Sequence, residues 1–281
     1  MQSLSYLVKY INLLEKIIKN RSVYSMNSLL LDGKKGLILG LSNDMSIAWG
    51  ITQQCALNGA ELCIMYQNEA MKKRALPLAE KVGCDFTVQC DFTVDGDVEN
   101  LVKEISEKWG KLDFIVHSIA FAPKEDLRGD YNKISGNGFA TAMNISVYSF
   151  INFSSQLAPL MKDGGSIMAM TYYGGEKVIK NYKLMGTCKA ALDSSVRELA
   201  SDFGSKNIRV NAISAGPIKT LASSGISEFS DLLKTFESRA PLGRTCTTEE
   251  VGKAAVFLLS DMSTAITGEI LHVDCGYNKI G

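Results

Sequence analysis

Short apolar segments alternate with longer amphipathic segments along most of this chain, and this alternation constrains the fold more than any other feature. The segment 112–117 is an almost continuous apolar run, typical of a strand buried on both faces of a parallel sheet. Strands are predicted at 36–40, 61–66, 86–90, 112–117, 165–170, 208–213 and 269–273. Helices are predicted from Ser46 onward and at 68–82, 95–109, 135–161, 181–203, 229–240 and 248–259. The pattern predicts an α/β fold: a doubly wound parallel sheet, Rossmann-like, with helices on both faces and ligands at the carboxyl ends of the strands.

Size and charge limit the function classes. The chain has 281 residues, of which 46% are apolar, so it can bury a large core. No internal repeat or linker follows residue 32, and we therefore expect one domain over 26–281. Thirty basic and thirty acidic residues leave no net charge, which favours small-molecule partners over nucleic acid.

Cysteines and histidines give little support for metal chemistry. Seven cysteines lie mostly inside apolar runs and form no Cys-x2-Cys pair, so we expect reduced, buried thiols and a cytoplasmic protein. His117 and His272 both lie beside predicted strands and are interpreted as core histidines, which argues against a metal site or a Ser-His-Asp triad. No apolar run reaches the roughly 18 residues that a membrane span needs.

Residues 1–25 differ from the rest of the chain. Leucine, isoleucine and valine recur there at helical spacing among lysines and one arginine, so the segment is basic and amphipathic. It fits an organelle transit peptide, a membrane-surface helix, or extra sequence upstream of a natural start at Met26. We favour the last interpretation, because the segment lacks an arginine-rich bias and a clear cleavage signal.

The first strand–helix connection has the character of a phosphate-binding site. Gly40 ends the strand, and Ser46 and Ile47 open a helix whose free N–H groups and dipole would attract a pyrophosphate. The usual G-x-G-x-x-G is absent, and the looser Gly40-x5-Ser46-Ile47-Ala48-x-Gly50 stands in its place.

Residues after the second and third strands indicate a dinucleotide. Gln67 follows the second strand, where such folds meet the adenosine ribose, and a neutral side chain there favours NADH over NADPH, although Lys72–Arg74 lie close by. Asp91 and Phe92 offer a polar and an aromatic group to the adenine. Alternatively, Asp91 caps the helix at 95–109.

Two further loops would line the site. The small residues of 118–123 permit close approach of a ligand at the end of the fourth strand. After the strand at 208–213, Pro217 ends the extended segment and Thr220 offers a hydroxyl to a carboxamide or a phosphate. The serine-rich stretch that continues to Ser230 has the length of a mobile lid.

The reacting groups are predicted on the helix at 181–203. Tyr182 and Lys189 are seven residues apart, so at about 100° per residue they share one face, roughly 10 Å apart along the axis. A phenol can donate to a developing oxyanion, and a nearby ammonium improves it as a donor and grips a hydroxylated ligand. Gly174 and Gly175 should end the preceding strand and let backbone come close to a ligand.

Tyr173 and Lys177 form a rival pair with the Tyr-x3-Lys spacing of ordinary short-chain dehydrogenases. Gly174 and Gly175 lie between them and disfavour helix, so we interpret this match as a coincidence.

From about Leu29 to Gly276 the sequence resembles the NADH-dependent enoyl-[acyl-carrier-protein] reductases of bacterial type II fatty acid synthesis, which are divergent short-chain dehydrogenases. The matching segments are Ser46-Ile47-Ala48-Trp49-Gly50, Tyr66-Gln67-Asn68, Gln89-Cys90-Asp91, 117–123, Tyr172, Asn181-Tyr182 with Lys189, and 209–220. Two departures, Ala120 before Phe121 and Phe92 in place of a small aliphatic residue, bear on ligand fit rather than on reaction class.

The resemblance implies roles for individual residues. Tyr182 is the catalytic tyrosine, Tyr172 the second active-site tyrosine, and Lys189 the ligand of the nicotinamide ribose. Ala122 would touch substrate. The cofactor-binding residues would be Gly40, Ser46 and Ile47 at the pyrophosphate, Gln67, Asp91 and Phe92 at the adenosine, Ile119 at the ribose, and Ile218, Lys219, Thr220, Leu221 and Ala222 at the nicotinamide.

The implied reaction is hydride transfer from NADH to a trans-2-enoyl thioester on acyl carrier protein, by a homotetramer. A ketone reductase on the same fold and a non-catalytic dinucleotide-binding protein remain alternatives. The missing helical Tyr-x3-Lys argues against the first, and the intact tyrosine and lysine argue against the second.

Overall fold

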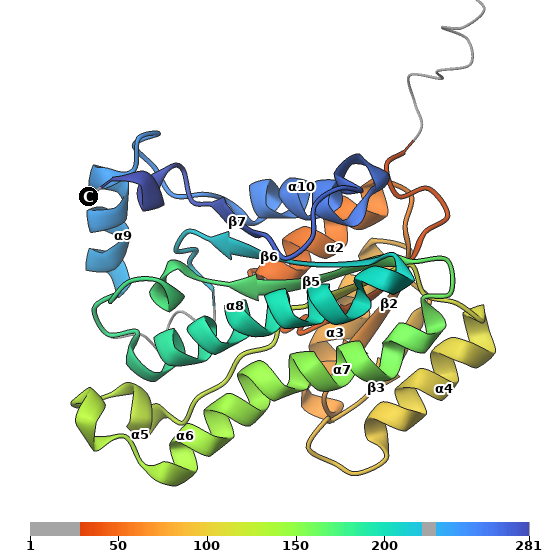
Figure 1. The fold of residues 1–281 in the computed structure, drawn as a ribbon, viewed down its shortest axis with the longest axis horizontal. Coiled ribbons are helices and arrows are strands. Elements are labelled where there is room, and N and C mark those ends of the chain that lie inside the picture. The colour runs from red at the N-terminus through yellow and green to blue at the C-terminus, as the bar shows by residue number, and fades with distance from the viewer. Residues whose placement is uncertain (1–28, 221–228, 281) are drawn as a thin grey trace, which may run out of the picture.

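The predicted doubly wound sheet is present. A computed structural model describes residues 29–220 and 229–280, and within them seven parallel strands run in the order β3-β2-β1-β4-β5-β6-β7 (Figure 1). The predicted extension at 1–25 and most of the predicted lid lie outside the described residues. Because β4 lies beside β1 rather than beside β3, the strand order reverses between β1 and β4, and a crevice at that point is where such folds bind ligands.

Predicted and observed elements agree to within a few residues for all the strands and the longer helices. The strands are β1 (Lys35–Leu39), β2 (Glu61–Tyr66), β3 (Phe86–Gln89), β4 (Phe114–His117), β5 (Gly165–Thr171), β6 (Ile208–Ala215) and β7 (Ile270–Val273). The longer helices are α2 (Ile47–Leu57), α3 (Glu69–Lys81), α4 (Asp97–Trp109), α6 (Gly136–Met143), α7 (Ser149–Leu157), α8 (Lys183–Phe203), α9 (Phe229–Arg239) and α10 (Thr248–Leu259).

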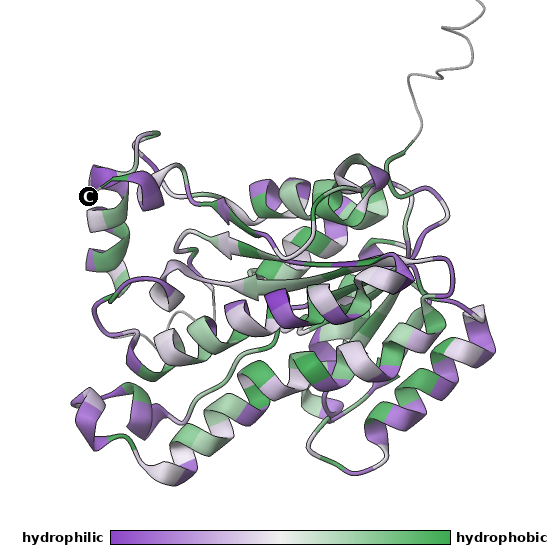
Figure 2. Ribbon diagram, viewed as in Figure 1, coloured by the Kyte–Doolittle hydropathy of each residue, from purple (hydrophilic) through white to green (hydrophobic). Residues whose placement is uncertain are grey.

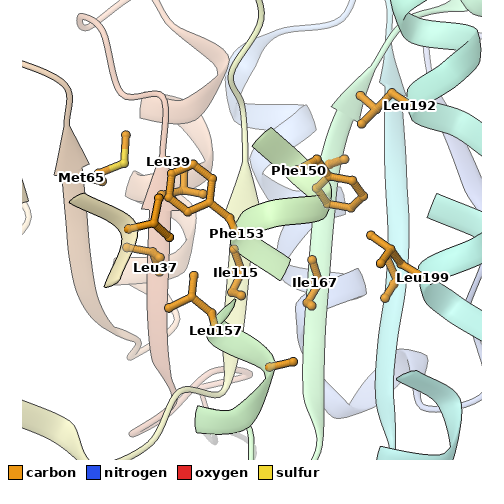
Figure 3. Packing of buried hydrophobic residues seen from close by; sticks show 14 of the residues in the cluster. Leu37, Leu39, Met65, Ile115, Phe150, Phe153, Leu157, Ile167, Leu192 and Leu199 are labelled. Atoms are coloured by element: carbon orange, nitrogen blue, oxygen red, sulfur yellow. The ribbon is translucent and has the colours of Figure 1, made fainter. Parts of the chain in front are cut away.

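Each face of the sheet carries its own apolar core. On one face α4, α7 and α8 cover the sheet, and Leu37, Ile115 and Ile167 pack beneath Phe150 and Phe153 (Figures 1 and 3). On the other face α2, α3 and α10 pack over the alternate residues of the same strands. Strands are therefore hydrophobic on both sides, whereas the helices are hydrophobic on the side toward the sheet (Figure 2).

Side-chain caps fix where several helices begin. Ser46 caps α2, accepting from the N–H of Trp49, and Asn68 caps α3, accepting from Met71. Thr247 and Glu250 form a capping box at α10, in which each side chain accepts from the backbone of the other residue. The predicted start at Ser46 is therefore confirmed.

The helix predicted at 135–161 is interrupted. Between α6 and α7 the backbone forms a π-helix over Asn144–Tyr148. The buried Ser149 hydroxyl bonds the carbonyl of Ile145 and the Nε2 of His117, and Ser146 exchanges hydrogen bonds with the backbone of Phe121. Tertiary contacts thus accompany the wider turn, which periodicity alone does not predict.

A short segment without a predicted element also has structure. It comprises α5 (Lys124–Leu127) and a 3-10 turn at Tyr131–Lys133, and the Tyr131 hydroxyl bonds Thr187 of α8 at 2.7 Å. None of the helices in the described part of the chain is long and apolar enough to cross a membrane.

Candidate active site

The predicted reacting groups gather at the carboxyl end of β5. Tyr172 directly follows the strand, and its ring meets the ring of Tyr182 edge-on, with centroids 4.7 Å apart. Lys189 is buried on α8, and its Nζ donates to the carbonyl of Met170 in β5 at 2.8 Å. The two tyrosines and the lysine therefore belong to one site beside the sheet.

The helix begins later than predicted. Tyr182 occupies the N-cap position of α8 rather than its interior, between Asn181 and Lys183, whose φ values are +65° and +41°. The prediction that Asn181 opens the helix is wrong, because a left-handed residue there turns the chain before the helix starts. Asparagine tolerates this conformation better than most residues, and the turn directs the phenol toward Tyr172.

Burial keeps both phenols protonated. It raises the pKa of Tyr182 well above its usual value, and the neighbouring Tyr172 adds to the effect. Burial likewise raises the pKa of Tyr172, and the Tyr172 hydroxyl finds no hydrogen-bond partner among the described residues. Two hydroxyl donors thus face the site, and one of them is buried and unpaired, as expected where a ligand group supplies the partner.

Burial has the opposite effect on the lysine. It lowers the pKa of Lys189 to about 8, although the carboxylate of Asp193 partly offsets the shift. His117, at the end of β4, is fully buried, and burial together with Lys189 lowers its pKa to about 3. The histidine is therefore neutral, and the positive charge of this region resides on the lysine.

Gly174 and Gly175 bring backbone close to α8. They lie in a 3-10 turn, η4 (Tyr173–Gly175), that rests on the helix. A Cβ at Gly174 would overlap the Tyr182 ring, and one at Gly175 would lie 2.9 Å from both Asp193 Oδ2 and the backbone nitrogen of Ala190. We expected these glycines to let the backbone come close to a ligand. In the structure they let it come close to α8, the helix that carries Lys189.

The rival pair is not helical. Tyr173 begins η4, and Lys177 lies exposed beyond its end. The Tyr173 ring meets His272 and Tyr277 edge-on, at 6.1 and 6.0 Å, so it belongs to a different cluster from Tyr182. The interpretation of the Tyr-x3-Lys match as a coincidence is confirmed.

One histidine prediction is confirmed only in part and the other is wrong. His117 is a core residue whose Nε2 bonds Ser149 at 2.8 Å, but its Nδ1 has no partner in the described part of the chain. His272 is not a core residue: its side chain is 18% exposed and its Nε2 lies 2.7 Å from Glu176 Oε1. β7 ends the described sheet, so a side chain there reaches solvent and meets η4.

The phosphate-binding end has the expected backbone. Gly40 adopts a φ of +96°, and a Cβ there would overlap the carbonyl of Ser118 after β4. The Ser46 hydroxyl donates to the Asn43 carbonyl at 2.7 Å and accepts from Trp49 at 3.2 Å. It is therefore engaged as a cap, and any anion bound here would rely mainly on backbone N–H groups and the dipole of α2.

The adenosine-side residues are joined to one another. Gln67 Nε2 donates to Asp91 Oδ2 at 2.8 Å, and Thr93 donates to Oδ1. Partial burial raises the pKa of Asp91, but these hydrogen bonds outweigh it and bring the pKa below its usual value. Asp91 does not cap α4, whose N-cap is Gly96, so the alternative interpretation is wrong. Phe92 packs near Phe153, with ring centroids 6.3 Å apart.

The remaining predicted residues lie around the same edge. Ile119 and Ile218 are partly buried at the ends of β4 and β6, and Ala122 is only 7% exposed. Lys219 and Thr220 follow β6, whereas Leu221 and Ala222 lie outside the described residues. No cluster of three or more His, Cys, Asp or Glu that could hold a metal occurs within the described ranges, and all seven cysteines are free.

Asp193 is the residue that sequence reasoning missed. It lies four residues after Lys189 on α8, is only 7% exposed, and faces the turn at Gly175. A Lys and an Asp at i and i+4 were a signal that the two side chains lie on the same side of the helix. A surface pair gives the same signal, however, and only the packing of η4 distinguishes the two cases.

Comparisons with known proteins agree with this geometry. Residues 40–278 match the family model described as Enoyl-(Acyl carrier protein) reductase. The enoyl-[acyl-carrier-protein] reductase [NADH] FabI of Rickettsia typhi is 54% identical over 256 residues, covering 91% of this chain and 98% of the relative. The corresponding enzyme of Aquifex aeolicus is 47% identical over 253 residues, covering 90% and 94%.

Solved structures show the same fold. The reductase of Anaplasma phagocytophilum, crystallised with NAD, superposes with a TM-score of 0.88 at 50% identity, covering 91% of this chain and 97% of that one. The Bacillus cereus reductase, crystallised with NADP+ and an indole naphthyridinone, gives 0.88 at 42% identity, with coverage of 90% and 99%. Since the family model and the relatives span most of this chain, and the two tyrosines and the lysine meet at the edge where the sheet would hold a dinucleotide, the chain belongs to the enoyl-(acyl carrier protein) reductase family.

Proposed function

We propose that the chain is an oxidoreductase of fatty acid biosynthesis that reduces trans-2-enoyl thioesters on acyl carrier protein with NADH, the last step of the elongation cycle. The observation that carries the proposal is the pair of protonated phenols, Tyr172 and Tyr182, beside the buried ammonium of Lys189. Identities of about 50% to reductases named for this reaction support it.

The protein's part in the reaction follows from the charges of these groups. Bound NADH supplies a hydride for the β-carbon of the substrate. Negative charge then develops on the thioester oxygen as an enolate, and the hydroxyl of Tyr182 donates a hydrogen bond to it. A proton from water at the α-carbon then gives the saturated thioester. Burial raises the pKa of the phenol, so it remains a hydrogen-bond donor at neutral pH. Tyr172, with its unpaired hydroxyl, is the second donor.

Lys189 has a different role in this proposal. Its ammonium would bind the hydroxyls of the nicotinamide ribose while the Met170 carbonyl holds its other side. A neutral His117 nearby adds no competing positive charge. The site residues thus divide into donors to the substrate oxygen and a holder of the cofactor.

The rest of the cofactor would lie along the carboxyl edge of the sheet. Backbone at Gly40 and the start of α2 would hold the pyrophosphate, and Gln67 with Asp91 the adenosine. A phosphate on the adenosine ribose would approach this carboxylate, so the pair favours NADH over NADPH. The nicotinamide end would be completed by Ile119 and by the segment 218–222, and Ala122 would line the substrate side.

We further propose a homotetramer that works in the cytoplasm, with acyl carrier protein as its partner. The family resemblance supports the assembly and the partner, and seven free cysteines fit a reducing compartment. Size-exclusion chromatography with light scattering measures the assembly directly, and a monomer would contradict it.

A steady-state assay tests the reaction. Crotonyl and acetoacetyl thioesters are offered in parallel, each with NADH and with NADPH, and absorbance of the reduced cofactor is followed. We expect turnover of the crotonyl thioester with NADH. Faster reduction of acetoacetyl thioester would instead indicate a ketone reductase, and no turnover of either would indicate a binding protein.

A further inference from the structure

A buried carboxylate lies directly behind the proposed cofactor-holding lysine. Asp193 follows Lys189 by one turn of α8, and the two side chains are only 7% and 6% exposed. The α8 residues around them, among them Met185, Leu192 and Val196, are buried in the core between this helix and the sheet. Asp193 therefore points inward, beneath the sheet edge, and not into solvent.

The surroundings of Asp193 are polar but incompletely paired. Thr171 of β5 and Ser214 of β6 are aligned across the two strands, and by strand alternation they share the face of Ala169 and Ala212, which lies against α8. The Thr171 hydroxyl lies beside the carboxylate. Asp193 Oδ1 and both hydroxyls lack a well-formed hydrogen bond within the described residues. At least one oxygen of the buried carboxylate is thus left without a hydrogen-bond donor from the described residues.

The charges around Asp193 single out one buried partner. Burial raises the pKa of Asp193, Thr171 and then Lys189 act to lower it, and Glu176, which follows η4, acts to raise it. Arg197, which is exposed one turn further along α8, also acts to lower the pKa of Asp193, but less than Lys189 does. The buried cation that compensates this carboxylate is therefore the lysine of the active site.

The same environment acts on the lysine. Around Lys189 stand Asp193 and Cys188 on α8, the neutral His117 at the end of β4, and the Met170 carbonyl on β5. Asp193 is the strongest of the groups that favour the charged form. A Cβ added at Gly175 would lie 2.9 Å from Asp193 Oδ2, so the η4 turn packs closely against this carboxylate.

We propose that Asp193 is a positioning residue: its buried carboxylate, one helical turn from Lys189, is the counter-charge that keeps this lysine protonated while the Met170 carbonyl holds the ammonium in place for the nicotinamide ribose. The inference rests on the role proposed for Lys189 and adds a residue that assists it. It also accounts for Gly175, because a side chain there would displace the carboxylate.

The proposal predicts a shift in pH dependence. The ammonium is present below the pKa of Lys189, about 8, and is lost as the pH rises through that value. Removing the carboxylate removes a group that raises this pKa, so in Asp193→Asn the ammonium is lost at lower pH. A shift of about one unit would weaken NADH binding at pH 8 about fivefold and leave binding at pH 6 nearly unchanged.

The experiment measures the NADH dissociation constant and kcat/KM from pH 6 to 9.5 for the wild type, for Lys189→Ala and for four further variants. Asp193→Asn and Asp193→Ser are two neutral replacements, so that a folded uncharged variant is obtained, and Asp193→Glu restores the charge. Asp202→Asn is the matched control, an exposed carboxylate further along α8. We expect the alkaline limb of NADH binding to move to lower pH in the neutral variants and to return in Asp193→Glu.

Two outcomes separate this inference from the proposed function. If Lys189→Ala weakens NADH binding but the neutral Asp193 variants keep the wild-type limb, the role of Asp193 is wrong and that of Lys189 stands. If Lys189→Ala binds NADH as the wild type does, the ribose contact itself is wrong. A loss of kcat in the neutral variants that is equal at every pH would show a structural role only and would also overturn the inference.

Discussion

The chemistry of a single residue, Tyr182, depends on where the chain turns. The phenol occupies the N-cap of α8, where Gly174 packs on its ring and Tyr172 meets it edge-on. Burial raises the pKa of this phenol, so the role proposed for it is that of a hydrogen-bond donor to the substrate rather than a phenolate base.

Replacement of that hydroxyl gives the first prediction. An oxyanion donor is worth about 3 kcal/mol, so Tyr182→Phe should lower kcat for crotonyl thioester by roughly a hundredfold or more and leave the NADH dissociation constant nearly unchanged. Tyr173→Phe is the matched control, because that ring faces His272 instead. Near-full turnover in Tyr182→Phe would remove the residue from this role.

The second prediction concerns the wild-type pH profile. Burial lowers the pKa of Lys189 to about 8, so the charged form prevails below that pH and declines above it. The kcat/KM for NADH should therefore fall on the alkaline side near pH 8, where Tyr182 is still protonated. Stopped-flow or steady-state measurements over pH 6 to 10 would show it, and a flat profile up to pH 10 would contradict the assignment.

The sequence predicted residues that lie together at the candidate site but not their neighbours. Tyr182 and Lys189 were predicted from their spacing and from the family resemblance, and both lie near the carboxyl end of β5. Asp193 was missed because an aspartate on a helix is usually solvated, and its burial depends on how η4 packs. The Gln67–Asp91 hydrogen bond joins residues on two strands, and no local pattern predicts such a partner.

At the scale of elements, two helices on one face of the sheet meet through glycines. Gly50 of α2 lies against the backbone of Thr248, and Gly252 of α10 lies against the backbone of Gly50. The helices therefore approach more closely than any side chain at these positions would allow, and this contact holds α2, the proposed pyrophosphate helix, in place.

This contact gives the third prediction. A Cβ at Gly252 would lie 2.5 Å from the Gly50 carbonyl oxygen, so Gly252→Ala should force the helices apart and cost about 1–3 kcal/mol of unfolding free energy. Gly204→Ala is the control, because no atom lies within 4 Å of a Cβ added there and the φ of −55° at Gly204 suits alanine. Urea denaturation compares the two, and equal stabilities would show that the helices adjust without cost.

The start of α10 gives the fourth prediction. Two hydrogen bonds from Arg244, and then those from Thr247, lower the pKa of Glu250 to about 2, so its stabilising effect is full above its ordinary pKa near 4.5 and is lost as pH falls toward 2. Glu250→Gln should cost about 1 kcal/mol at pH 7 and progressively less below pH 4.5. Chemical denaturation at several pH values measures the difference, and a difference that is constant with pH would contradict it.

Elements that follow from periodicity were predicted, whereas those that depend on tertiary contacts were not. The apolar runs of β1, β2, β4, β5 and β6 are visible because both faces of these strands are buried. The π-helix at Asn144–Tyr148 is not visible, since its buried Ser146 and Ser149 find their partners after β4 and at His117. The 3-10 turn η4 contains Gly174 and Gly175, and their close packing against the α8 region is a tertiary contact that no local pattern predicts.

At the scale of the whole molecule, the sheet determines where a cofactor can lie. The order reverses between β1 and β4, and the residues proposed to bind the cofactor follow β1, β2, β3, β4 and β6. Ligands that bind the folded state raise its stability by mass action. A dinucleotide held by residues from so many strands should therefore stabilise the fold as a unit.

The described residues, which begin at residue 29, belong to the core of the fold from Leu31 on. Leu31 is fully buried, its N–H donates to the carbonyl of Asn58 after α2, and β1 begins at Lys35. We therefore propose that the reductase domain starts near Met26.

The last prediction compares the full chain with a chain that begins at Met26. We expect the two to have the same Tm and the same Tm shift on adding NADH, and kcat values for crotonyl thioester that agree to within about twofold. Thermal melts with and without NADH, together with light scattering of both chains, provide the measurement. A lower Tm, a smaller NADH shift or a changed assembly in the shortened chain would mean that the extension packs on the domain, and a preference of the full chain alone for anionic vesicles would instead support a membrane-surface helix.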